Sequence, residues 1–256
     1  MKPAAALAAC VLLAACASTR APLPMIAPQG YLSAGEVAPV ADRIASPGLP
    51  VEATGSPVEP GTDRWWLAIA HAELRPPEAA QHFDCALGTR LAARPRPALT
   101  RLMARLLADA NALTRDAARK HGHSARPIAR DPGLEPCQRV TAAMRDSPSY
   151  PAAGAIAGTL YGEAFAALAP DRAAQVRRIG REIGASRMIC RMNSEQDVYA
   201  GAQGGRDLFP RIAASDEFRV DLEAARVEVA AARAEGLANP SCAAERRALG
   251  PMPGAG

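Results

Sequence analysis

Residues 97–120 read PALTRLMARLLADANALTRDAARK and carry the longest helical pattern in the chain. Apolar residues recur there at i, i+3, i+4 and i+7, which places them on one face of an amphipathic helix. That face consists of Leu99, Leu102, Met103, Leu106, Leu107, Ala110 and Leu113. Gly122 and Pro127 follow, so we predict that this helix ends near Lys120. Such a wide apolar face needs other elements to cover it.

Shorter helical patterns lie on both sides of this stretch. Their ranges are 65–70, 155–168, 176–183 and 218–229. Aromatic residues make up only 4% of the chain, and no alternating apolar run predicts a strand. We therefore predict an all-α protein, with a single helical-bundle domain over residues 61–240 and a C-terminal tail over residues 241–256.

Composition bounds the class of protein. Of the 256 residues, 49% are hydrophobic and 22% are charged, which fits one globular domain and excludes a disordered chain. The net charge is +4, but Lys and Arg form no long block and are not interleaved with aromatic residues. A nucleic-acid partner is therefore not predicted. A pocket for a small anion accounts for the positive charge more simply.

The N-terminal residues have the pattern of a secretory signal. A positive charge precedes an uncharged apolar run over residues 4–15, which is too short to span a bilayer as a helix. The run ends in Leu-Ala-Ala before Cys16 and resembles the bacterial lipoprotein cleavage box, in which the cysteine is lipidated. Cys10 fits the same box with a run about half as long, and an ordinary signal peptide is the alternative.

We predict a lipoprotein signal peptide over residues 1–15 and lipid attachment at Cys16. Because Ala17 rather than an aspartate follows, the resemblance implies an anchor in the outer membrane of a Gram-negative bacterium, with the body in the periplasm. Residues 16–60 hold many of the chain's 23 prolines, which oppose helix formation, so we predict a Pro-rich tether there. Tyr31 and its neighbours are candidates for docking this arm onto the domain.

Four cysteines remain beyond the signal: Cys85, Cys137, Cys190 and Cys242. In an oxidising compartment they predict two disulfides, for which three pairings exist. No pair of them has the spacing of a zinc site, so we predict neither a metal nor another cofactor.

Three segments carry the chemistry. Residues 119–127 read RKHGHSARP, residues 149–158 read SYPAAGAIAG, and residues 184–197 read GASRMICRMNSEQD. In this order they resemble the signature of the class A bacterial acid phosphatases, in the type-2 phosphatidic acid phosphatase and vanadium haloperoxidase superfamily. That signature runs Lys-x6-Arg-Pro, then Pro-Ser-Gly-His, then Ser-Arg-x5-His-x3-Asp.

The likeness extends over residues 31–235 and implies an all-helical bundle with a phosphate pocket among the helix ends. In this family one histidine attacks phosphorus, a second protonates the leaving alcohol, and the aspartate orients the nucleophile. The resemblance also implies a disulfide between Cys137 and Cys190, which leaves Cys85 to pair with Cys242.

Carried over residue by residue, the phosphate-binding positions are kept. Arg126 and Arg187 occupy the two arginine positions, and Arg119 stands where the family has lysine. Lys120 takes that place if the helix shifts register. The resemblance thus implies a site for phosphate or a phosphomonoester. The alternative for the three arginines is a solvated surface with an ordinary salt bridge to Asp197.

The catalytic positions are not kept. Asn193 replaces the nucleophilic histidine and Gly154 the acid/base histidine, while Asp197 keeps the orienting position. Ala152 and Ala153 replace the motif's serine and glycine. An amide nitrogen has no basic lone pair and glycine offers no proton, so we expect the covalent mechanism to be lost.

Three functions fit these residues. The first is a catalytically inactive or severely impaired lipoprotein that binds a phosphorylated ligand. The second is an active acid phosphatase of low efficiency, which uses water directly or a relocated histidine such as His121 or His123. The third is an envelope interaction protein whose pocket has collapsed. His71 and His82 have no partner pattern and are interpreted as structural.

Overall fold

The computed structural model of the protein describes residues 28–46 and 58–250. Within these ranges it has eleven α-helices, three short 3-10 helices and no strand, which confirms the predicted all-α class. The α-helices are α1 (Ala34–Ala45), α2 (Asp63–Ala70), α3 (Asp84–Leu87), α4 (Pro97–His121), α5 (Pro127–Arg130), α6 (Ala142–Asp146), α7 (Ala153–Leu168), α8 (Ala173–Ile189), α9 (Glu195–Ala214), α10 (Asp216–Ala234) and α11 (Cys242–Leu249). The 3-10 helices are η1 (Glu78–Phe83), η2 (Leu91–Ala93) and η3 (Pro170–Arg172).

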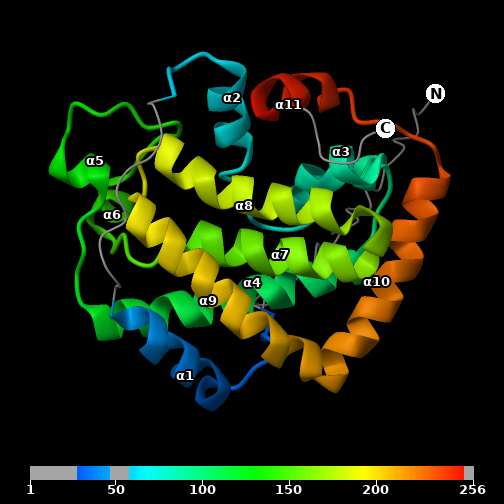
Figure 1. Cartoon of the computed structure of the whole chain (residues 1–256), viewed down its shortest axis with the longest axis horizontal. Coiled ribbons are helices and arrows are strands. Elements are labelled where there is room, and N and C mark those ends of the chain that lie inside the picture. The colour runs from blue at the N-terminus through cyan, green and yellow to red at the C-terminus, as the bar shows by residue number, and fades with distance from the viewer. Residues whose placement is uncertain (1–27, 47–57, 251–256) are drawn as a thin grey trace, which may run out of the picture.

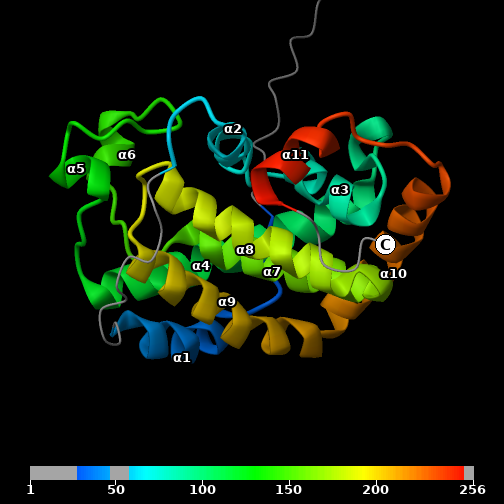
Figure 2. The same ribbon diagram turned by 45° about the horizontal axis from the view of Figure 1, so that its top comes forward.

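The helices form one bundle around α7 (Figure 1). Helices α8, α9 and α4 pack around this central helix, and α10 runs across one end of the bundle (Figure 2). The short helices α5 and α6 lie at the opposite end, while α2 and α11 pack together beside α8. The predicted single helical domain is therefore confirmed. Helix α10 covers one end of the bundle, and α5 and α6 cover the other.

Helix α4 is the long helix that the sequence predicts. Pro97 occupies its first turn, where a missing N–H costs nothing, and its apolar face is buried against α7, α1 and α10. Gly122 has a φ of 87° and ends the helix, because a left-handed residue cannot continue it. The observed C-terminus at His121 lies one residue beyond the predicted one.

Helix α7 is built from small residues and is buried on nearly every side. Gly158 faces Gly180 of α8 so closely that a Cβ on Gly158 would lie 2.4 Å from the carbonyl oxygen of Gly180. Only glycine allows the two backbones to approach in this way. The sequence pattern of alanine and glycine over residues 155–168 thus reflects a helix packed at short range on its neighbour.

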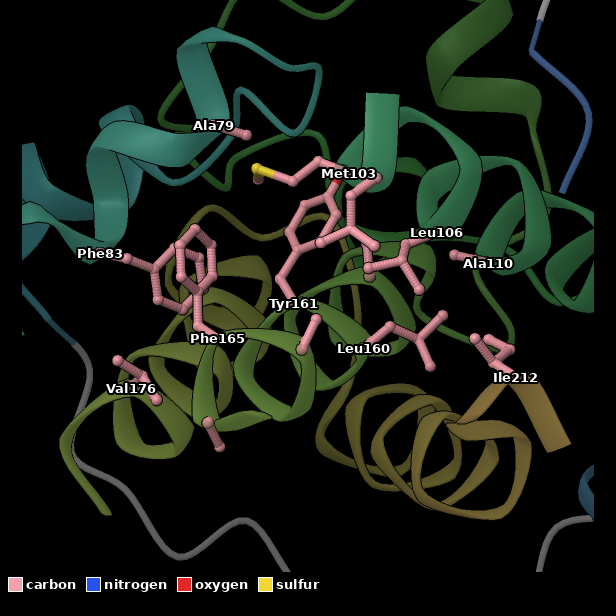
Figure 3. Close-up of a cluster of buried hydrophobic side chains, with 14 of the residues drawn as sticks. Ala79, Phe83, Met103, Leu106, Ala110, Leu160, Tyr161, Phe165, Val176 and Ile212 are labelled. Carbon is pink, nitrogen blue, oxygen red and sulfur yellow. The ribbon is translucent and has the colours of Figure 1, made fainter. Parts of the chain in front are cut away.

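The main core lies between α7 and α4 (Figure 3). Leu160 and Tyr161 lie between α7 and Met103 and Leu106 of α4, while Phe165 stacks on Phe83. All of these side chains are fully or almost fully buried. The Tyr161 hydroxyl is not left unpaired, since it donates to a backbone carbonyl at 2.8 Å.

The predicted tether over residues 16–60 is wrong for part of its length, because residues 34–45 form α1. Val37, Val40 and Ile44 are buried against α4 and α9. The Tyr31 hydroxyl donates to Asp221 of α10 at 2.9 Å, so the arm does dock onto the domain. A single proline inside α1 removes one backbone hydrogen-bond donor from the helix. The burial of the apolar face of α1 outweighs the cost of that lost hydrogen bond. The predicted signal peptide and Cys16 lie outside the described residues.

The predicted C-terminal tail is also wrong for residues 242–249, which form α11 and pack on α2 and α3. Cys242 at its start is bonded to Cys85 of α3. The second disulfide joins Cys137 to Cys190, so both implied pairings are confirmed. In the described part of the chain, no helix has the length and apolar character needed to span a bilayer.

Candidate functional site

Four helix ends meet at the end of the bundle that carries α5 and α6 (Figure 1). The C-termini of α4 and α8 and the N-termini of α7 and α9 converge there. They surround a cavity of about 250 Å³. Its lining consists of Ala72, Leu74, Thr114, Arg126, Gln138, Met144, Pro148, Ser149, Pro151, Ala153, Gly154, Arg187 and Asn193. The structure therefore brings together four residues that the motifs single out: Arg126, Gly154, Arg187 and Asn193.

Arg187 is the main charge of this cavity. It lies in the last turn of α8 and is partly buried. Burial, and then the positive charge of Arg126, lower the pKa of Arg187 to about 10. No carboxylate of residues 28–46 and 58–250 forms an ion pair with its guanidinium. Taking a cation partly out of water without an acidic partner is costly, and an anion in the cavity would relieve that cost.

Arg126 stands just before α5 and holds the cavity wall together. Its Nε donates to the carbonyl of Met144 at 3.0 Å, and its Nη1 donates to the carbonyl of Met192 at 2.8 Å. Its Nη2 donates to Ser147 Oγ and to the carbonyl of Pro148, both at 3.0 Å. Burial lowers the pKa of Arg126, and Asp197 offsets part of that effect. Arg126 is thus both a structural link and a second positive charge.

The N-terminus of α7 adds a third source of positive potential. Its first residues, Ala153 and Gly154, line the cavity, and Ala152 before them provides no side-chain cap. The first N–H groups of a helix have no acceptor within the helix, and the helix dipole makes this end positive. Helix ends of this kind bind phosphate and sulfate in many proteins.

Asn193 and Asp197 do not form the pair that the motif implies. Asn193 Nδ2 donates to the backbone carbonyl of Ser149 at 2.6 Å. Asp197 Oδ2 accepts from Ser149 Oγ at 2.5 Å and from the backbone N–H of Ser194 at 2.7 Å, which caps α9. Ser149 therefore stands between the two residues. In this arrangement Asp197 orients a serine hydroxyl and a helix end.

No histidine lines the cavity, although all four histidines of the chain lie in the described residues. His71 Nδ1 contacts Ser186 Oγ at 2.9 Å on the other side of α8, and burial lowers the pKa of His71 well below its ordinary value. His82 contacts the Glu73 carbonyl at 2.8 Å. These two buried rings fit the predicted structural role.

His121 and His123 do not enter the cavity either. His121 donates to the carbonyl of Ala45 at 2.8 Å and stacks on the ring of Tyr150. His123 is exposed in the loop after α4. Neither His121 nor His123 is therefore placed to act on a ligand in the cavity.

The structure does not bring Arg119 to the cavity. Its side chain is 73% exposed and pairs with Asp116 one turn earlier at 3.0 Å. Lys120, the alternative, pairs with Asp42 of α1 at 2.6 Å. The rotation of α4 about its axis turns both residues toward α1, whereas Arg126 lies beyond the turn that ends α4. The predicted set of three arginines is thus reduced to two in this geometry.

Thr114, Gln138 and Met144 line the cavity and were missed from sequence. Thr114 lies on α4, Met144 lies on α6, and Gln138 lies on the loop between α5 and α6. No motif marks them, because each reaches the site through tertiary packing. Among the described residues, no group of His, Cys, Asp and Glu side chains is arranged to hold a metal ion.

No protein-family model matches the chain. Comparison with characterised proteins finds acid phosphatases. The chain is 27% identical over 171 residues to a non-specific acid phosphatase of Salmonella typhimurium, an alignment that covers 66% of this chain and 68% of the relative. It is 29% identical over 175 residues to an acid phosphatase of Zymomonas mobilis, covering 68% of this chain and 65% of the relative. A non-specific acid phosphatase of Salmonella typhi is 26% identical over 171 residues. The chain is thus a distant homologue of bacterial non-specific acid phosphatases and spans about two thirds of their length.

Proposed function

We propose that this acid phosphatase-like protein binds phosphate or a small phosphomonoester and that it hydrolyses such esters very slowly or not at all. The observation that carries the proposal is a cavity that, in the described part of the chain, is lined by a partly buried arginine without a carboxylate partner and by no histidine. Arg187 supplies a charge that favours a phosphate group. No histidine, cysteine or carboxylate lines the same cavity within the described residues, so a family-type nucleophile and proton donor are missing.

We expect the proposed loss of activity to appear as a large decrease in kcat. Removing a nucleophile that acts as part of a catalytic unit costs on the order of 10⁶ in kcat, and further losses then add little. The amide of Asn193 is already engaged by the carbonyl of Ser149 at 2.6 Å and is not basic. Gly154 holds no proton to donate. Neutralisation of phosphate charge by Arg187 and Arg126 is the only part of the mechanism left.

The cavity favours a small ligand. Its volume of about 250 Å³ is below the size of pockets that enclose drug-sized molecules, which begin at about 300 Å³. A guanidinium binds phosphate through paired, charge-assisted hydrogen bonds, and the open end of α7 offers backbone donors beside it. We infer that the phosphate group lies between Arg187 and this helix end.

Calorimetric titration of the purified protein with inorganic phosphate tests the binding half of the proposal. We expect heat of binding together with a rise of the melting temperature that grows with phosphate concentration. Absence of both would refute phosphate binding and favour the third function, an interaction protein with a closed pocket.

A weak phosphomonoesterase is the alternative function. The observation in its favour is Ser149, which lines the cavity and whose hydroxyl donates to Asp197 at 2.5 Å. Hydrolysis of an aryl phosphate at mildly acidic pH distinguishes the two functions. Turnover that rises with protein concentration and disappears in Arg187→Ala would establish the alternative and overturn the inactive assignment.

The two disulfides indicate an extracytoplasmic location, because such bonds persist in oxidising compartments. We further propose that the mature protein is a periplasmic lipoprotein anchored through Cys16 to the outer membrane, on the strength of the cleavage box before that residue. Mass spectrometry of the membrane-bound protein should find acyl chains on Cys16. An unmodified N-terminus elsewhere would instead support an ordinary signal peptide.

A further inference from the structure

The space beside Gly154 is filled by Arg187. A Cβ atom placed on Gly154 would lie 2.7 Å from Cδ and 2.9 Å from Cγ of Arg187, and 3.4 Å from its Nε. Contacts of 2.7 and 2.9 Å between carbon atoms are far inside the optimal separation of about 3.5–4.0 Å. The stem of Arg187 therefore crosses the first turn of α7 where any other residue at position 154 would place its side chain.

This contact differs from those of the packing glycines in the bundle. The single nearest atom to a Cβ on Gly158 is the backbone carbonyl oxygen of Gly180, and the three nearest atoms to a Cβ on Gly180 are all backbone atoms of α7. For Gly154 the three nearest atoms all belong to the side chain of Arg187. Gly158 and Gly180 thus set the distance between two helices, whereas Gly154 sets the course of one side chain.

We propose that Gly154 is a positioning residue of the anion site, and that its missing side chain is what lets the Arg187 guanidinium lie across the N-terminus of α7. This inference rests on the proposed phosphate binding. The loss of the acid/base histidine then has two effects: it removes a proton donor and allows the arginine to occupy the vacated space. A histidine restored at position 154 meets the same atoms of Arg187.

Gly154→Ala tests the inference, and Gly35→Ala is its matched control. Both glycines occupy the second position of a helix, in α7 and α1 respectively. A Cβ on Gly35 would meet only Ser33 Oγ at 3.9 Å, so alanine fits there freely. We expect Gly154→Ala to raise the phosphate Kd about tenfold, the loss of about one charge-assisted hydrogen bond, and Gly35→Ala to leave it unchanged.

A crystal structure of Gly154→Ala tests the positioning role directly. If Gly154 only helped α7 to fold, the position of the Arg187 side chain would not change. We expect the Arg187 guanidinium to be displaced from the end of α7 while the backbone of α7 and α8 stays in place. If the variant is too unstable to titrate, the double variant Gly154→Ala with Arg187→Ala should recover the melting temperature of Arg187→Ala alone. Recovery would show that the clash is with this arginine.

An unchanged phosphate Kd in folded Gly154→Ala, or an undisplaced Arg187 in its structure, would overturn the inference and leave phosphate binding intact. So would failure of the double variant to recover. Failure of the proposed function looks different: the unmodified protein would not bind phosphate at all, whatever stands at position 154.

Discussion

Arg187 and Arg119 are both assigned to phosphate by the sequence motif, but their surroundings differ. Arg187 lines the cavity and is partly buried, and burial and the positive charge of Arg126 lower its pKa to about 10. Arg119 is exposed and paired with Asp116 on its own helix. Water screens an exposed charge, and such surface pairs contribute little. Of these two arginines, only Arg187 is therefore placed to act on a ligand in the cavity.

The first prediction follows from this contrast. Arg187→Ala should weaken phosphate binding about 10- to 100-fold, because hydrogen bonds to charged groups contribute about 1.5–3 kcal/mol. Arg119→Ala should leave the calorimetric Kd unchanged and serves as the control. Equal losses in both variants would mean that Arg119 reaches the ligand after all, as the motif implies.

At the residue scale, the sequence predicts which residues form the cavity better than it predicts where their side chains point. Motif spacing correctly brings Arg126, Gly154, Arg187 and Asn193 to one cavity. It misplaces Arg119, since where a side chain on a long helix points depends on how that helix is rotated against its neighbours. It also does not reveal that Ser149 takes the hydrogen bond of Asp197, because a serine in a turn carries no distinctive signal.

At the scale of elements, helix α11 carries a buried acidic residue that the sequence pattern does not predict. Glu245 of α11 is buried near Asp84 of α3. Burial, and then the negative charge of Asp84, raise the pKa of Glu245 from 4.5 to about 7, against the opposing effect of Arg246 and Arg178. The folded chain therefore holds this proton more tightly than the unfolded chain does.

The second prediction is the resulting pH dependence. The stabilisation linked to this proton is fully present below about pH 4.5 and is lost as the pH rises to about 7, amounting to about 1–3 kcal/mol. Glu245→Gln keeps the shape but not the charge, so its free energy of unfolding should vary less over this window. Urea titrations of both proteins at pH 5 and pH 7.5 measure the difference. Parallel curves would show that Glu245 is ionised in the fold.

Helices α4, α7, α8 and α10 were predictable because their apolar residues recur with helical spacing over two turns or more. Several other helices were missed, among them the long helix α9, and α1 and α11 were missed for different reasons. Helix α1 has the same spacing in Val37, Val40 and Ile44, but the surrounding prolines favoured a tether. Helix α11 is short and polar, and it is held by Cys242 and by contacts with α2 that local sequence does not encode.

At the scale of the whole molecule, the two disulfides hold different ends of the bundle. Cys137–Cys190 ties the loop between α5 and α6 to the end of α8, beside the cavity. Helix α6, which follows that loop, supplies the carbonyl of Met144 that Arg126 binds. Cys85–Cys242 fastens α11 to α3, away from the residues that line the cavity.

The third prediction distinguishes the disulfide beside the cavity from the disulfide that holds α11. Replacing either pair by alanine should lower the free energy of unfolding by about 2–5 kcal/mol, the usual effect of removing a native disulfide. Only the variant without Cys137 and Cys190 should also bind phosphate more weakly at a temperature where both are folded. A weaker calorimetric Kd in the variant without Cys85 and Cys242 would show that the site is coupled to the whole bundle.

The most direct test of the whole account is a ³¹P NMR spectrum of an aryl phosphate incubated with the purified protein. The account predicts that the ester signal broadens with wild-type protein, stays sharp with Arg187→Ala, and yields no inorganic phosphate over hours. An inorganic phosphate signal that grows with wild-type protein and is absent with Arg187→Ala would contradict it, as would an ester signal that never broadens.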